Sequence, residues 1–182
     1  MALLQTPLCD FGKKIINFDL TNVDNINISL DNYFGDNGTL IMFICNHCRY
    51  VKAVIEKIVI TSKELKKYKI NSLAIMPNDV INYPEDSFEN MQKFSKNFKF
   101  DFPYLLDETQ EVSKLYGAVC TPDFFGYNKF GELQYRGRIA EMKNLQFQND
   151  TNELLNAMIE IAETSKGPKK QFASAGCSIK WK

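Results

Sequence analysis

The chain has 182 residues, of which 45% are hydrophobic and 13% aromatic, a composition that excludes a disordered or fibrous protein and fits one folded domain. Its 22 basic and 22 acidic residues cancel, so no net charge indicates nucleic acid or an anionic membrane as a partner. No apolar run approaches the roughly 18 residues of a membrane span, and the N-terminus lacks the pattern of a secretion signal. We therefore expect a cytoplasmic protein.

Apolar spacing predicts alternating strands and helices along the first two thirds of the chain. Residues 39–45, "TLIMFIC", are typical of a central strand, and apolar residues three and four positions apart then predict a helix of about five turns ending near Leu65. Residues 70–79 predict a second strand and residues 87–98 a second helix. An extended segment, 100–107, precedes a short helix around Leu115, for which Asp107 and Gln110 resemble a capping box.

The last third of the chain completes an α/β pattern. Residues 121–138 predict a hairpin with its turn at 128–131, and Asp150 with Glu153 resembles a second capping box, opening a helix. The sequence therefore predicts a partly parallel sheet flanked by helices, closed by an antiparallel hairpin. Residues 164–182 lack periodicity, which indicates an extended C-terminal tail after a domain of residues 1–163.

The motif "CNHC", residues 45–48, stands at the predicted junction of a strand and a helix. A helix N-terminus carries a partial positive charge and free N–H groups, so a thiol there ionises readily. We assign Cys45 as the nucleophile, and Cys48, which we expect to be more buried, as the resolving thiol. His47, the only histidine, would stabilise a Cys45 thiolate and tune the pair; the alternative is an ordinary surface histidine.

Metal and haem are weaker readings of this pair of cysteines. A closed zinc site needs four ligands, usually from a second pair, and the remaining cysteines, Cys9, Cys120 and Cys177, are isolated. Covalent haem attachment needs a histidine directly after the second cysteine, where Arg49 stands. We therefore predict no metal and no cofactor, and we expect free thiols rather than a disulfide framework.

A C-x-x-C motif at the start of a long helix, followed about seventy residues later by "CTPDFF" and a hairpin, resembles the thioredoxin superfamily. The resemblance implies a thioredoxin fold, with a central mixed sheet flanked by helices and an extra helix and strand between the C-x-x-C helix and the proline strand. It also implies a cis peptide bond between Thr121 and Pro122, where the adjacent backbone pairs with an extended substrate.

A more specific resemblance covers nearly the whole chain. The stretches "FICNHCRYV", "NDVINYPEDS", "FPYLLDETQEV", "YGAVCTPDFF", "YRGR" and "GCSIKW" are similar to those of soluble bacterial thioredoxin-like proteins related to alkyl hydroperoxide reductase and thiol-specific antioxidant. That group usually has proline in place of Arg49, whose charge would either stabilise a thiolate or simply face solvent.

Two further thiols are candidates for auxiliary roles. Cys120, two residues before Pro122, is expected near the site, although burial alone would explain it and would keep it inert. Cys177 lies on a tail that we expect to be flexible, and it would then reach Cys45 or another chain as a resolving or relay thiol.

The residues before Cys45 separate two redox functions. Peroxiredoxins have threonine three positions and proline seven positions before the reactive cysteine, where this chain has Met42 and Gly38. We therefore predict a thiol-disulfide oxidoreductase; the alternative is an antioxidant thiol peroxidase acting through Cys45. Its expected partners are a protein or small-molecule disulfide or thiol and an unidentified thiol-disulfide electron donor or acceptor.

Overall fold

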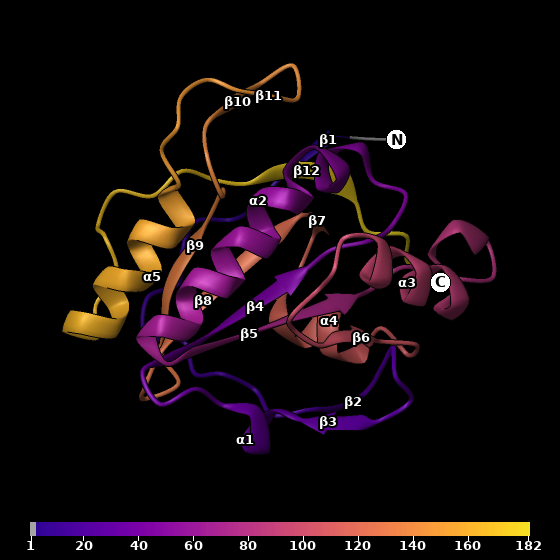
Figure 1. Ribbon diagram of the computed structural model, residues 1–182, viewed down its shortest axis with the longest axis horizontal. Coiled ribbons are helices and arrows are strands. Elements are labelled where there is room, and N and C mark those ends of the chain that lie inside the picture. The colour runs from indigo at the N-terminus through magenta and orange to yellow at the C-terminus, as the bar shows by residue number, and fades with distance from the viewer. Residues whose placement is uncertain (1–2) are drawn as a thin grey trace.

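The predicted strands form the centre of a seven-stranded sheet in a computed structural model that describes residues 3–182 (Figure 1). Its strand order is β3 (Asn27–Ser29), β2 (Asp19–Asn22), β6 (Tyr104–Leu106), β5 (Ile70–Met76), β4 (Gly38–Phe43), β8 (Asp123–Asn128) and β9 (Leu133–Gly137). β4, β5 and β6 are parallel because helical crossovers connect them, whereas β2 and β8 join them antiparallel. The mixed sheet and the closing hairpin of β8 and β9 confirm the predicted fold class.

Helices cover both faces of this sheet. α2 (Arg49–Leu65), α3 (Phe88–Asn97) and α5 (Glu153–Thr164) pack on one face, and α1 (Leu30–Tyr33) and α4 (Glu111–Tyr116) on the other. Side chains alternate along a strand, so Leu40 and Met42 of β4 face the first group of helices, and Ile41 and Phe43 face the second. All four side chains are fully buried, as expected of a central strand. The 3-10 turns η1 (Lys66–Tyr68) and η2 (Pro84–Asp86) lie in the connections.

Both predicted capping boxes are wrong, although the helices themselves are present. α4 begins after Gln110, and the carboxylate of Asp107 instead accepts hydrogen bonds from the backbone N–H and the hydroxyl of Ser113, at 2.7 and 2.6 Å. Asn152 caps α5, because its side-chain oxygen accepts the backbone N–H of Leu155 at 3.0 Å. Gln110 at the start of α4 makes no side-chain cap, so which residue caps a helix depends on the local backbone, and sequence spacing alone does not identify it.

The C-terminal segment is extended, but the prediction that it is flexible is wrong. β12 (Ala175–Ser178) lies between β1 (Leu3–Gln5) and β7 (Cys120–Thr121) in a second sheet. In this sheet Cys177 lies opposite Thr121 and is only 3% exposed. A small hairpin of β10 (Met142–Lys143) and β11 (Gln146–Phe147), also not predicted, projects at the top of the molecule (Figure 1).

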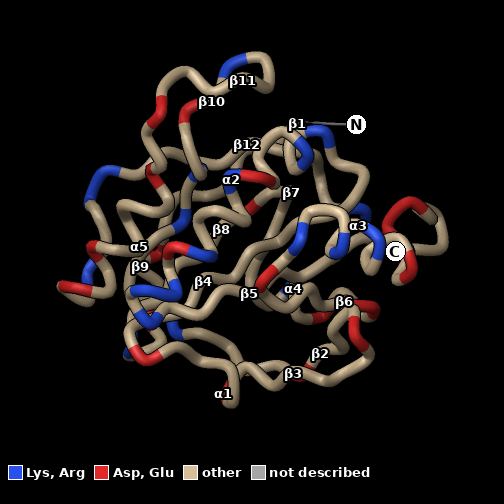
Figure 2. Tube along the Cα trace, in the orientation of Figure 1, with Lys and Arg blue, Asp and Glu red and all other residues tan. Residues whose placement is uncertain are grey.

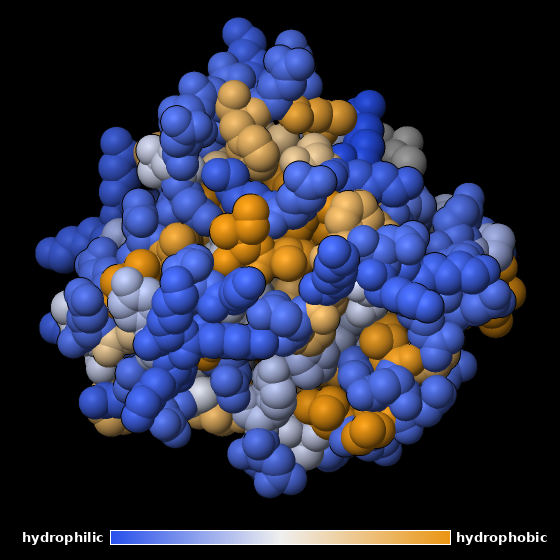
Figure 3. All heavy atoms as spheres, viewed as in Figure 1, coloured by the Kyte–Doolittle hydropathy of each residue, from blue (hydrophilic) through white to orange (hydrophobic). Residues whose placement is uncertain are grey.

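The surface shows no dominant charge or continuous apolar belt in the views drawn. Basic and acidic residues are interspersed along the trace (Figure 2), in agreement with the zero net charge. Hydrophilic side chains cover most of the visible face, and apolar groups reach the surface over α2 (Figure 3). Within residues 3–182, none of the helices has the length and apolar character that crossing a membrane would need.

Candidate active site

Cys45 and Cys48 lie between β4 and α2, as predicted, and both contact Thr121. Cys45 Sγ lies 3.2 Å from the hydroxyl oxygen of Thr121, and Cys48 Sγ lies 3.2 Å from the carbonyl oxygen of the same residue. The peptide bond between Thr121 and Pro122 is cis, as the resemblance implied. Cys45 is 1% and Cys48 0% exposed, so the expected difference in burial between the two is absent.

The surroundings of the pair favour a thiolate at Cys48 over one at Cys45, whereas the sequence pattern favoured Cys45. A hydrogen bond from the Cys45 thiol lowers the pKa of Cys48 to about 5, against the effect of burial and with help from the backbone N–H groups of Val51 and Cys177. The same hydrogen bond, burial and the nearby Asp86 carboxylate raise the pKa of Cys45. The helix N-terminus also lies at Cys48 rather than at Cys45, because α2 begins only after Cys48, its N-cap residue.

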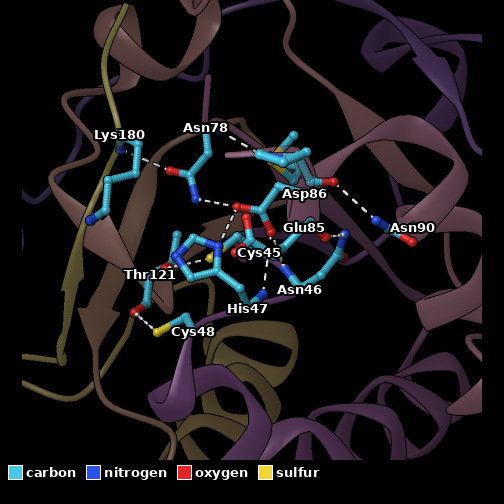
Figure 4. A network of polar contacts seen from close by, with 12 residues as sticks. Cys45, Asn46, His47, Cys48, Asn78, Glu85, Asp86, Asn90, Thr121 and Lys180 are labelled. Carbon is cyan, nitrogen blue, oxygen red and sulfur yellow. Dashed lines mark hydrogen bonds and ion pairs between the residues drawn. The ribbon is translucent and has the colours of Figure 1, made fainter. Parts of the chain in front are cut away.

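Asp86, from η2, connects the motif loop to a buried polar network (Figure 4). Its Oδ2 lies 2.6 Å from His47 Nδ1 and accepts the side-chain amide of Asn78 at 2.7 Å. Its Oδ1 accepts the backbone N–H groups of Asn46 and His47, at 2.8 and 3.2 Å. Asp86 is therefore the residue that positions the loop before Cys48, with its side chain completely buried.

This network sets the charges of His47 and Asp86. The hydrogen bond with Asp86 raises the pKa of His47 despite partial burial. Burial opposes ionisation of Asp86, but hydrogen bonds from His47 and Asn78 outweigh it and hold the pKa of that carboxyl below its usual value. An imidazolium at His47 thus faces Asp86 directly and also interacts electrostatically with Cys48. Sequence analysis missed Asp86, because a carboxylate in a loop far along the chain carries no local sign of burial.

Within the described residues, one group combines metal-ligand chemistry: Cys45, His47 and Asp86, whose ligand atoms lie within 4.8 Å of one another. The 2.6 Å between His47 and Asp86 is a hydrogen-bond distance. Two ligands of one tetrahedral zinc ion would lie roughly 3.3 Å apart, given zinc–ligand distances near 2.0 Å. The geometry therefore fits a hydrogen-bonded network better than a zinc site.

The substrate-facing role predicted for Thr121 and Pro122 needs revision. β12 pairs with β7, so the backbone of Thr121 lies against Cys177 of the same chain and is not free for an extended substrate. Pro122 instead lines a cavity of about 630 Å³, together with Arg49 and Tyr50. Arg49 is exposed, with its Cζ 5.1 Å from the centre of the Tyr50 ring, and therefore offers a positive charge at the cavity wall.

The three remaining cysteines differ in their surroundings. Cys120 is fully buried, burial raises its pKa, and its thiol points at the carbonyl oxygen of Pro122 at 3.9 Å, which fits an inert packing role. Cys9 belongs to the other face of the sheet, and burial raises its pKa to about 12. Cys177 lies beside Cys48, and burial followed by the hydrogen bond with Cys48 raises its pKa to about 11.

Two buried thiols lie where a central parallel strand meets the helix that covers it, beside a cis-proline turn. This arrangement defines a thiol redox protein of thioredoxin-like fold. A putative thioredoxin from Neisseria meningitidis shares this fold, with a TM-score of 0.58 over 74% of this chain and 84% of that chain at 21% identity. Residues 11–139 match the AhpC/TSA family. The chain belongs to that family.

Two relatives are more similar in sequence. An uncharacterized conserved protein from Geobacillus kaustophilus is 39% identical, with a TM-score of 0.94 over 100% of this chain and 97% of that chain. The thiol-disulfide oxidoreductase ResA of Bacillus thuringiensis is 26% identical over 147 residues, which are 80% of this chain and 77% of that protein. The similarity to the first extends through the C-terminal segment, beyond the region that defines the family match.

Proposed function

We propose that this protein is a thiol-disulfide oxidoreductase in which Cys45 and Cys48 alternate between dithiol and disulfide. The observation that carries the proposal is the placement of both sulfurs on one residue, Thr121, at 3.2 Å each. The adjacent Pro122 opens to a cavity in which a protein or small-molecule disulfide would dock. The similarity to a named thiol-disulfide oxidoreductase supports the same conclusion.

The reaction needs only the two sulfurs and one shared proton. Cys45 attacks the substrate disulfide as its proton passes to the neighbouring Cys48 thiolate, forming a mixed disulfide and releasing one substrate thiolate. Cys48 then loses that proton and attacks Cys45, which closes the Cys45–Cys48 disulfide and releases the second substrate thiolate. Oxidation of a substrate dithiol is the same path in reverse. The low pKa of Cys48 makes its sulfur available for the second attack near neutral pH.

Peroxide reduction is less well supported by the surroundings of Cys45. Met42 and Gly38 occupy the two positions discussed above, lie in the buried strand β4, and offer no side-chain donor to a peroxide oxygen. Arg136, the first arginine of "YRGR", forms an ion pair with Asp123 at 2.8 Å and stacks on Phe125. Phe125 belongs to the face of the sheet away from α2. The threonine that positions the peroxide in peroxiredoxins is therefore missing, although Arg49 and Arg138 line the cavity beside Pro122.

Stopped-flow reaction of the reduced protein with a model protein disulfide, beside its reaction with hydrogen peroxide, tests the proposal. We expect fast exchange with the disulfide and slow reaction with peroxide, and loss of exchange in Cys45→Ser. Cys48→Ser should accumulate a mixed disulfide through Cys45, whereas Cys9→Ser, on the other face of the sheet, should behave as the wild type. Rapid peroxide consumption would make the protein a peroxidase instead, and a mixed disulfide in Cys45→Ser would assign the first attack to Cys48.

A further inference from the structure

The C-terminal strand β12 lies against the turn at Pro122 and beside the start of α2 (Figure 1). In its register with β7, Cys177 lies opposite Thr121, and Ser178 lies opposite Cys120. Residues directly opposite in an antiparallel pair have Cα atoms about 4.5–5.5 Å apart. Cys177 is thus held one strand spacing from the residue that contacts both thiols of the proposed redox pair.

Three sulfur atoms therefore converge on Thr121. Cys45 lies against its hydroxyl and Cys48 against its carbonyl oxygen, and Cys177, directly opposite Thr121 in β12, packs in the same buried cluster as both cysteines. β12 also contacts α2, the helix that begins directly after Cys48. All three are free thiols, and each is at most 3% exposed. A buried sulfur next to a reactive sulfur meets the first requirement of exchange, because the attacking thiolate must reach the disulfide sulfur directly.

The position of β12 is determined by specific contacts rather than by chance packing. The Ser174 hydroxyl donates to the carbonyl oxygen of Pro122 at 2.8 Å, and the backbone N–H of Lys180 donates to the Asn78 side chain at 2.9 Å. Gly176 lies so close to Thr121 that an added Cβ would collide with the Thr121 carbonyl group. The strand therefore needs glycine at this position to approach the site, and it brings Cys177 to one defined place.

We propose that Cys177 is a third exchange thiol of the active site and forms a disulfide with Cys48 within the chain. The proposal rests on the proposed function, because the Cys45–Cys48 disulfide supplies the oxidising equivalents. The Cys177 thiolate attacks Cys48, the Cys45–Cys48 bond breaks, and the Cys48–Cys177 bond forms. The electron pair leaves on Cys45, which takes up the proton that Cys177 lost, so one disulfide replaces another without an added oxidant.

This exchange has two consequences for the site. It returns Cys45 to the thiol state while the chain still holds one disulfide, so the attacking sulfur is free for another substrate. It also joins β12 covalently to the N-cap of α2, which closes the C-terminal segment over the backbone of Thr121. The strand that blocks Thr121 from an extended substrate thereby becomes part of the redox centre.

The full-length Cys45→Ser variant tests the inference directly. We expect oxidation with one equivalent of diamide to remove both Cys48 and Cys177 from titration with a thiol reagent. Peptide mapping after an acid quench should then identify a disulfide between them. Thermal unfolding followed by circular dichroism establishes that the variant is folded. The matched control is the double variant that carries Cys45→Ser and Cys9→Ser, which should form the same disulfide. Two thiols that stay titratable, or a disulfide formed only between chains, would overturn the inference.

The wild-type chain provides the second measurement and separates the two proposals. In a glutathione redox buffer, mapping should find disulfides of Cys48 with both Cys45 and Cys177. If the disulfide with Cys177 is absent while Cys177→Ser exchanges with substrate at the wild-type rate, this inference fails and the proposed function stands. If the disulfide with Cys45 is also absent and substrate exchange is lost, the proposed function fails as well.

Discussion

Replacing Asp86 by asparagine tests whether the buried carboxylate organises the active-site loop. Asp86 accepts four hydrogen bonds: from the backbone N–H groups of Asn46 and His47 at 2.8 and 3.2 Å, from the His47 ring at 2.6 Å, and from Asn78 at 2.7 Å. Asparagine keeps the shape but replaces one acceptor oxygen with an NH₂ donor. The change removes the charge and leaves at least one buried donor without a partner.

The magnitude follows from these contacts. A hydrogen bond to a charged group contributes roughly 1.5–3 kcal/mol, and a buried donor left unpaired costs roughly 1–3 kcal/mol. The His47 side chain is 13% and that of Asp86 0% exposed, so solvent screens their interaction little. We expect Asp86→Asn to lower the free energy of unfolding by about 3–5 kcal/mol, the range for breaking a buried ion pair. The control Glu85→Gln removes an exposed charge next to it and should change stability by about 0.5 kcal/mol or less.

The loss of stability should depend on pH in a definite direction. The hydrogen bond with Asp86 raises the pKa of His47, so its contribution is complete below about pH 6.5 and is lost as the pH rises through the folded-state value. The pKa of Asp86 is lowered by His47 and Asn78 despite burial, so its contribution is present above about pH 3.9 and is lost as the pH falls through the folded-state value. The difference between wild type and variant is therefore largest between about pH 4 and 6.5.

Urea denaturation of wild type, Asp86→Asn and Glu85→Gln across this range measures the differences, and an NMR titration of His47 should show a lower pKa in Asp86→Asn. A stability difference that does not change with pH would refute the assignment of charge to the His47–Asp86 pair. Equal effects of the two substitutions would refute the role of the buried contacts.

Three further predictions concern neighbouring groups. Cys45→Ala should raise the pKa of Cys48 from about 5 toward the ordinary value near 8.5, because a hydrogen-bond donor is lost. Titration of the thiolate absorbance measures this pKa, and an unchanged value would contradict the prediction. Arg136→Met leaves its partner Asp123 buried without a counter-charge and should cost about 3–5 kcal/mol in chemical denaturation, whereas a loss below about 1 kcal/mol would indicate a weak pair. Gly176→Ala should displace β12, because the added methyl group collides with the Thr121 backbone. Labelling of the Cys177 thiol by a thiol reagent should then become about tenfold faster for each 1.4 kcal/mol by which opening of the strand becomes easier. Labelling at the wild-type rate would disprove the close packing.

The sequence by itself determined the elements that carry the site. The apolar run of residues 39–45 and the three-and-four spacing after it are confirmed as β4 and α2, because hydrophobic periodicity reflects which side of a local element faces the core. The C-x-x-C pair was therefore placed correctly at their junction. The cis bond before Pro122 came from family resemblance, since the residues around it carry no local pattern that requires it.

Only the tertiary structure decided how the site works. Asp86 reaches His47 across 39 positions of the chain, and Cys177 lies opposite Thr121 through strand pairing of the C-terminal segment. The acidity of Cys48 depends on where α2 begins and on thiols and N–H groups from distant segments. Such contacts form when the chain packs, so the charge of the pair and the presence of a third thiol beside it follow from packing rather than from local sequence pattern.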